Sequence, residues 1–199
     1  MQLNNTEIVI ATHNKGKIPE ISSLVKPYGC IVSIASDYNI CEPVEDGLTF
    51  EDNALLKARH SAKASTKVSL ADDSGLCVVG LDNKPGIYSA RYAGAKKDFN
   101  LAIQRINDEL NDRKVTDMSA FFVCCLAIVN PITKQELVFR GEVHGQLTFP
   151  PRGNKGFGYD PIFIPDGYDI TFGEMEPQQK HLISHRSDAF RKMKEFCFA

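Results

Sequence analysis

Short apolar runs and longer amphipathic stretches follow one another along the chain. Apolar runs rich in β-branched residues at 8–11, 31–34, 68–71, 76–79 and 120–129 predict buried strands. Stretches at 18–25, 50–63 and 98–110 place apolar residues three or four apart and predict helices, with Asp98 as the expected N-cap of the last one. This succession is typical of an α/β fold. Residues 136–143 follow the longest apolar run across a turn, so we expect an antiparallel pair and a mixed sheet.

Two adjacent carboxylates, Asp72 and Asp73, stand between two of these apolar runs. Ser74 and Gly75 predict a turn that separates two strands. Successive side chains of a strand point to opposite sides, so at most one of the two carboxylates faces a given cleft. The other carboxylate can then orient or brace the surrounding side chains. A carboxylate at the end of a buried strand commonly holds a metal or activates a water. The alternative is a polar turn in which an aspartate caps its own backbone.

A polar loop at 12–17, T-H-N-K-G-K, joins the first predicted strand to the first predicted helix, with Asn14 as the expected N-cap. The free N–H groups at such a junction favour phosphate, and Lys15 and Lys17 add positive charge. The loop is not a Walker A motif, because Ala11 stands where its first glycine belongs. The alternative is a pair of solvated lysines beside a capped helix.

An acidic loop contains Glu42, Glu45 and Asp46 and leads into a capping-box pattern that begins at Thr49. Mg²⁺ favours a few carboxylates together with phosphate and water oxygens. One carboxylate of this loop is therefore a candidate second metal ligand beside Asp73. An exposed loop and helix start is the alternative.

A glycine-rich stretch at 153–163 lets the backbone approach a flat ligand. Phe157 is placed to stack on such a ligand, and Asp160 to accept hydrogen bonds from ring N–H groups. The alternative is a turn with Phe157 and Tyr159 packed inward. The later stretch K-H-L-I-S-H-R at 180–186 contains a His-Arg pair, which is usually solvated, but Leu182 and Ile183 beside it place the pair close to the core and raise the odds of a placed role.

Composition narrows the classes of protein. The 199 residues suit one domain over 1–199 or two small lobes that share a core, and 43% hydrophobic residues favour a globular chain. A net charge of −2 gives no broad basic field for nucleic acid. The six cysteines include no C-x-x-C pair, so we expect buried reduced thiols in the cytoplasm rather than structural zinc. We expect no signal peptide and no membrane segment.

Six separated stretches together resemble the inosine triphosphate pyrophosphatase family. Each motif alone is weak, but their joint order and spacing are highly specific, and they extend over nearly the whole chain. The stretches are T-H-N-K-G-K at 12–17, T-F-E-D-N-A-L-L-K-A at 49–58, A-D-D-S-G-L at 71–76, P-G-I-Y-S-A-R-Y-A-G at 85–94, and G-F-G-Y-D-P-I-F at 156–163 followed by K-H-L-I-S-H-R at 180–186.

The resemblance implies a two-lobed α/β fold with a long mixed sheet flanked by helices, an active-site cleft between the lobes, and a homodimer. It implies hydrolysis of ITP, dITP or XTP to the nucleoside monophosphate and pyrophosphate with Mg²⁺, which removes non-canonical purine nucleotides from the pool.

The resemblance also implies roles for individual residues. Asp73 is similar to the general base and a metal ligand, Glu45 is our choice of second ligand over Glu42 or Glu51, and Lys57 reaches the phosphates. His13 is a departure, because many members have glycine there. The implied substrate contacts are Thr12, His13, Asn14, Lys15, Gly16 and Lys17 with the triphosphate, Ser74 with the substrate, Phe157, Gly158, Tyr159 and Asp160 with the purine, and Lys180, His185 and Arg186 with the base.

Two other classes of function stay open. A metal phosphatase built on Asp72 and Asp73 would release orthophosphate and would not need the purine-reading stretch. A non-catalytic nucleotide-binding module would bind ITP without turnover. A Ser-His-Asp hydrolase is disfavoured, because no G-x-S-x-G elbow is present.

Overall fold

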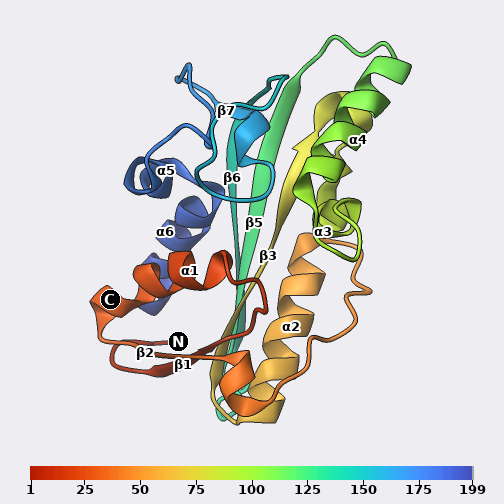
Figure 1. Ribbon diagram of the computed structural model, residues 1–199. Coiled ribbons are helices and arrows are strands. Elements are labelled where there is room, and N and C mark those ends of the chain that lie inside the picture. The colour runs from red at the N-terminus through yellow and green to blue at the C-terminus, as the bar shows by residue number, and fades with distance from the viewer. Residues whose placement is uncertain (199) are drawn as a thin grey trace. The chain divides into compact units, whose positions relative to one another are not determined.

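A seven-stranded sheet runs in the order β2-β1-β3-β5-β6-β7, with β4 paired to β3 (Figure 1). The computed structural model describes residues 1–198. β1 pairs in parallel with β2 and β3, whereas β4 is antiparallel to β3 and β7 to β6. The predicted α/β class and mixed sheet are confirmed. The strands are β1 Glu7–Ile10, β2 Ile31–Ile34, β3 Val68–Val78, β4 Lys84–Pro85, β5 Ser119–Val129, β6 Glu136–Leu147 and β7 Phe163–Pro165.

The helices begin close to the predicted positions, and two predicted N-caps are confirmed. Thr49 Oγ1 accepts a hydrogen bond from Asp52 N at 3.1 Å, and Asp98 Oδ1 accepts one from Asn100 N at 3.0 Å. These side chains satisfy N–H groups that lack helical partners. The helices are α1 Lys17–Val25, α2 Phe50–Ser65, α3 Ser89–Tyr92, α4 Phe99–Asp112, α5 Pro177–Ile183 and α6 His185–Cys197.

The prediction that Asn14 caps α1 is wrong, because Gly16 occupies the N-cap position. The Asn14 side chain acts earlier, where its Oδ1 accepts a hydrogen bond from Gly16 N at 2.9 Å. Asparagine commonly bonds the backbone two residues ahead, and this local turn competes with the capping geometry.

The predicted turn at Ser74 and Gly75 is also wrong, because β3 continues without a break from Val68 to Val78. Gly75 is needed for close packing rather than for a turn. A Cβ atom at this position would lie 2.3 Å from the carbonyl oxygen of Gly86. A glycine inside a strand often marks such an approach of another backbone segment, and sequence pattern does not distinguish it from a turn glycine.

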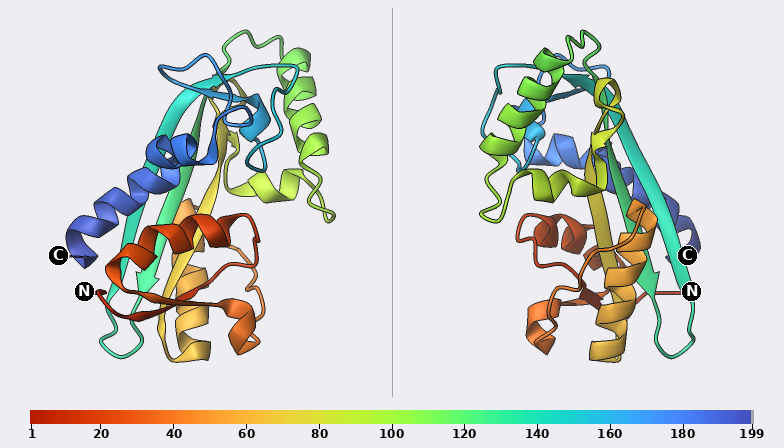
Figure 2. Two further views of the ribbon diagram at one scale, coloured as in Figure 1. Left: turned by 60° about the vertical axis from the view of Figure 1, so that its left-hand side comes forward. Right: turned by 90° about the vertical axis from the view of Figure 1, so that its right-hand side faces the viewer.

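The chain divides into two compact units. Unit 1 contains Met1–Asp73, Cys124–Gly141 and the part from Arg186 onward. Its apolar core joins Ile10 of β1 and Leu70 of β3 to Ile21 of α1 and Phe190 of α6. α2 lies on the other face of these strands, where Ser69 Oγ donates to Ser61 Oγ at 3.1 Å (Figure 2).

Unit 2 contains Ser74–Val123 and Glu142–His185. Its core packs Ile106 and Leu110 of α4 with Leu76, Phe122 and Phe163. Residues 80–94 contain the short strand β4, short 3-10 turns and the short helix α3. Within residues 1–198, none of the helices combines the length and apolarity that a bilayer span requires.

Candidate active site

The polar loop at 12–17 follows β1 and folds back on itself before α1. Thr12 Oγ1 accepts from Asn14 N at 3.2 Å, and Asn14 O accepts from Lys17 N at 3.0 Å. These bonds give the loop a defined shape ahead of the first turn of α1. Lys15 is exposed, whereas the ammonium group of half-buried Lys17 forms an ion pair with Asp72. The N–H groups of Asn14, Gly16 and Lys17 all donate within the loop, and the Lys17 ammonium is held at the start of α1 by Asp72. A fixed positive charge at a helix start is a feature that favours phosphate.

Lys57 of α2 brings together a strand carboxylate and an acidic-loop carboxylate. Its Nζ lies 2.6 Å from Asp73 Oδ1 and 2.9 Å from Glu45 Oε1. Burial alone lowers the pKa of Lys57, but the two carboxylates more than offset it and raise that pKa. Burial raises the pKa of Asp73 despite the nearby Lys57 and Lys17 charges. The protonated form of Asp73 is thus more favourable than in an ordinary aspartate, because the carboxylate is buried.

The pair Glu45 and Asp73 fits a Mg²⁺ site. Mg²⁺ in proteins is commonly held by one or two carboxylates, with water and substrate phosphate oxygens completing the octahedron. Within residues 1–198, no group of three or more histidine, cysteine or carboxylate side chains is placed to hold a metal. The two carboxylates already share one cation, Lys57, so they lie close enough for a joint role. Glu51, one of the alternative ligands, instead pairs with Arg140 at 3.0 Å.

Asp72 is fully buried and lies in a separate charged cluster. Its Oδ2 accepts from Arg186 Nε at 2.7 Å and from Cys124 Sγ at 3.1 Å, and its Oδ1 pairs with Lys17. Arg186 also pairs with Glu20 of α1. Burial alone would raise the pKa of Asp72, but the charges of Arg186 and Lys17 hold that pKa well below its usual range. Asp72 therefore stays ionised and joins α1 to α6.

Asp72 and Asp73 contact different sets of elements, as the strand pattern predicted. Asp72 contacts side chains of α1 and α6, whereas Asp73 contacts Lys57 of α2. The alternation of strand side chains produces this separation. The expectation that one carboxylate is available for chemistry and the other braces is consistent with these contacts.

A second candidate cluster lies in unit 2, around the glycine-rich stretch. Asp160 Oδ2 accepts from Lys180 Nζ and from Phe157 N, both at 2.7 Å. The Lys180 ammonium also lies 4.8 Å from the centre of the Phe157 ring, within cation–π range. Tyr159 packs inward, and its hydroxyl donates to Ser89 O at 2.8 Å. Tyr159 thus follows the alternative interpretation, while the Phe157 ring is held next to a charge.

The remaining predicted contacts are placed as follows. Ser74 is half-buried and follows Asp73 directly on β3. The buried ring of His185 stacks on Phe122, with centroids 5.0 Å apart and planes at 14°. Arg186 is 1% exposed and is committed to Asp72 and Glu20, so its role as a base contact stays a prediction.

Comparison with known proteins places this chain in a family. A model of the Ham1 family matches residues 8–196. A dITP/XTP pyrophosphatase of Rhodospirillum centenum is 51% identical over 195 residues, which cover 96% of this chain and 95% of the relative. A dITP/XTP pyrophosphatase of Caulobacter vibrioides is 49% identical over 192 residues, which cover 96% of this chain and 98% of the relative. The chain belongs to the Ham1 family.

Solved Ham1 structures agree with this assignment. The HAM1 protein of Coxiella burnetii has a TM-score of 0.88 at 36% identity and covers 96% of this chain and 98% of its own. A nucleoside-triphosphatase/dITP/XTP pyrophosphatase of Mycobacterium abscessus has a TM-score of 0.76 at 36% identity, and the match covers 97% of this chain and 100% of the Mycobacterium abscessus chain. The family resemblance that the motifs indicated is confirmed.

Sequence reasoning missed three side chains of this Ham1 chain that hold the clusters together. In the sequence Glu20 is one position of an amphipathic helix, but in the structure it pairs with Arg186. Cys124 lies in an apolar run of the sequence, but in the structure its thiol donates to Asp72. Asn53, fully buried in α2, accepts from Gly47 N at 2.9 Å and so fixes the end of the acidic loop. The sequence signal for Asn53 was a polar residue next to apolar ones, Phe50 and Ala54, on one face of the predicted helix.

Replacement of Gly156 by alanine tests the unit 2 cluster. Gly156 has φ +71°, and a Cβ atom there would lie 2.0 Å from Asp160 Oδ2. Alanine must therefore displace the carboxylate that holds Lys180 and the Phe157 backbone. We expect the KM for ITP to rise roughly tenfold, because displacement and backbone strain together cost about 1–3 kcal/mol. Steady-state kinetics with ITP and Mg²⁺ give the value.

Gly167 provides the matched control for that variant. Its φ is +83°, yet nothing lies within 4 Å of a Cβ atom built there. Gly167→Ala thus has a similar backbone cost without displacing Asp160, and its KM should stay near that of the unchanged protein. Equal KM values for the two variants would remove Asp160 from the binding site.

Proposed function

We propose that this chain hydrolyses non-canonical purine nucleoside triphosphates, ITP, dITP or XTP, to the nucleoside monophosphate and pyrophosphate. The observation that carries the proposal is the convergence of Asp73 and Glu45 on Lys57, in a chain 51% identical to a dITP/XTP pyrophosphatase. The same arrangement alone would suit several phosphate-releasing enzymes. The family relationship favours a purine nucleotide. The unit 2 cluster supports the same choice, because it offers the Phe157 ring for stacking and the Asp160 carboxylate as an acceptor.

The proposed reaction is attack of water on the α-phosphorus. Asp73 accepts a proton from the water, the new P–O bond forms, and the bond to the β-phosphate oxygen breaks, so that pyrophosphate leaves. Lys57 holds Asp73 in position, and Lys17 neutralises phosphate charge. Phosphoryl transfer depends mainly on such positioning and charge stabilisation.

Glu45 and Asp73 are the residues that we propose to hold Mg²⁺. When bound, the ion supplies positive charge against the triphosphate oxygens. The backbone of the acidic loop and Asn53 keep Glu45 near Asp73 in the protein itself. We infer a cytoplasmic homodimer from the same family relationship, and light scattering of the purified protein measures the assembly.

Purine selection is assigned to the unit 2 cluster together with His185 and Arg186. A 6-keto purine presents an acceptor and an N1–H donor, whereas adenine presents the reverse pattern. A buried site matched to the first pattern leaves polar groups unpaired with the second, which discriminates by several powers of ten. Asp160 is the acceptor that we assign to N1–H. Guanine differs from hypoxanthine only by its 2-amino group and presents a separate problem of selection.

Product analysis with ITP and Mg²⁺ tests the proposal directly. Pyrophosphate and orthophosphate are assayed separately, with ATP and GTP in parallel. IMP and pyrophosphate from ITP, with ATP and GTP nearly untouched, are the expected products. Orthophosphate would indicate a metal phosphatase on the same carboxylates. Binding of ITP without any product would indicate a nucleotide-binding module.

A further inference from the structure

The acidic loop at 41–47 has no regular secondary structure and is held by bonds from outside it. Near its end, Gly47 N donates to Asn53 Oδ1, and in its middle Glu45 pairs with Lys57, each at 2.9 Å. Both of these partners belong to α2. At its start, the carbonyl oxygen of Ile40 lies 2.9 Å from His13 Nε2. That third attachment comes from the phosphate loop at 12–17.

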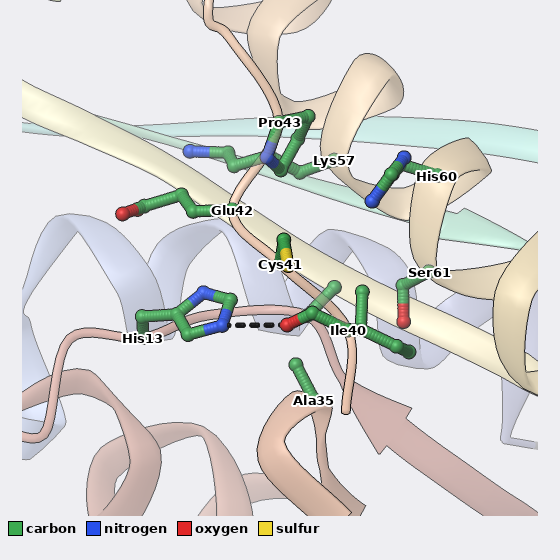
Figure 3. A pocket seen from close by; sticks show the side chains of 10 residues that line it. His13, Ala35, Ile40, Cys41, Glu42, Pro43, Lys57, His60 and Ser61 are labelled. Carbon is green, nitrogen blue, oxygen red and sulfur yellow. Dashed lines mark hydrogen bonds between the residues drawn. The ribbon is translucent and has the colours of Figure 1, made fainter. Parts of the chain in front are cut away.

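The bond between His13 and Ile40 has a defined direction. A carbonyl oxygen only accepts, so Nε2 carries the hydrogen and donates it. Figure 3 shows the ring turned toward this carbonyl, with Cys41 and Glu42 following along the acidic loop. Ile40 is buried at 7% exposure and its N–H donates to Ala35 O at 3.1 Å, so the His13 bond adds to these contacts in holding the residue that precedes the acidic loop.

We propose that His13 is a positioning residue that couples the phosphate loop to the acidic loop and thereby places Glu45 against Asp73. The inference deepens the proposed function, since it rests on Glu45 and Asp73 acting as the Mg²⁺ ligands. The imidazole acts through the backbone of Ile40 and does not itself touch the metal.

The space beside the ring explains why the side chain matters. His13, Ile40 and Lys57 line a cavity of about 10 Å³, room for about one water molecule. Removal of the imidazole opens this space and deletes the cross-loop bond at once. Residue 13 then no longer holds the Ile40 carbonyl, which precedes the acidic loop. Glu45 therefore moves more freely relative to Asp73.

Two variants separate the hydrogen bond from the bulk of the ring. His13→Phe keeps a ring and removes the donor, whereas His13→Gln carries an amide N–H at a similar reach. With ITP held constant, we expect His13→Phe to raise the half-saturating free Mg²⁺ concentration about threefold to tenfold, the effect of losing one partly exposed hydrogen bond. His13→Gln should restore most of the loss. A raised KM for ITP with an unchanged Mg²⁺ midpoint would make His13 a direct substrate contact and overturn the proposal.

Amide hydrogen exchange of the protein without metal or nucleotide gives a second readout that does not need turnover. His13→Phe should speed exchange in peptides covering 41–45, leave those of α2 unchanged, and be reversed by His13→Gln. Unchanged exchange in 41–45 would overturn the coupling. If the unsubstituted protein failed to hydrolyse ITP, the proposed function would fall, and the exchange measurement would still decide whether the two loops are coupled.

Discussion

Asp73→Asn is expected to lower the turnover of ITP by a factor of about 10³ or more, while the nucleotide still binds. Removal of a general base alone costs about 10²–10⁴ in rate, and the same substitution removes a charged oxygen proposed to hold Mg²⁺. Asparagine keeps the shape of the side chain but takes no proton from water. Lys57 retains Glu45 as its partner at 2.9 Å, so the ammonium is not stranded. Single-turnover kinetics and calorimetric titration of the nucleotide measure the two effects separately.

The stability of the Asp73→Asn variant and the size of its rate loss decide between the possible roles of Asp73. Asp73→Asn should change the melting temperature by only a few degrees, because Asp73 is not part of the buried cluster around Arg186. Turnover within tenfold of the unchanged protein would show that another group takes the proton. Lost nucleotide binding with the fold intact would instead make Asp73 mainly a binding residue.

The strand and helix pattern was largely predictable, because it depends on local spacing. Alternation along β3 predicted that Asp72 and Asp73 would diverge, and they contact different helices. Thr49 and Asp98 cap helices as their positions before amphipathic stretches indicated. These features need no knowledge of distant residues, since a cap or an alternating face is decided within a few positions.

The charged clusters were not predictable in the same way, because their members meet only after folding. Arg186 is far along the chain from Asp72 and Glu20, and sequence pattern offers no measure of that contact. Arg186 was assigned to the base by family resemblance, whereas its visible partners are carboxylates. Gly75 illustrates the same limit, because the approach of Gly86 and Ser89 to β3 decides its role.

The pH dependence of stability follows from the sign of the Asp72 shift. The pKa of Asp72 is depressed in the folded chain, chiefly because the Arg186 and Lys17 charges overcome the cost of burial. Its stabilisation is therefore complete above the unfolded pKa of about 3.9 and is lost as the pH falls through the lower folded value. Between neutrality and about pH 5, this group should leave the free energy of unfolding unchanged.

Asp72→Asn is expected to lower the free energy of unfolding by about 3–5 kcal/mol, because it removes the negative partner of the buried Arg186 and the half-buried Lys17. Arg186 is 1% exposed and would keep only Glu20 as a carboxylate partner among these residues, while Lys17 would lose its ion pair. For a chain of this size, the change corresponds to a fall in melting temperature of roughly 6–20 °C. Urea unfolding at neutral pH measures the free energy, and calorimetry the temperature.

A double variant decides whether the loss comes from an uncompensated charge or from packing. Replacing a buried pair by apolar side chains of similar size is often neutral or stabilising, whereas breaking one partner is costly. Asp72→Leu combined with Arg186→Met should thus be more stable than Asp72→Leu alone, with a coupling energy of about 1–3 kcal/mol. Additive losses in the cycle would show that Asp72 and Arg186 stabilise the fold independently. In that case the cluster would be a set of packed side chains rather than an electrostatic brace between α1 and α6.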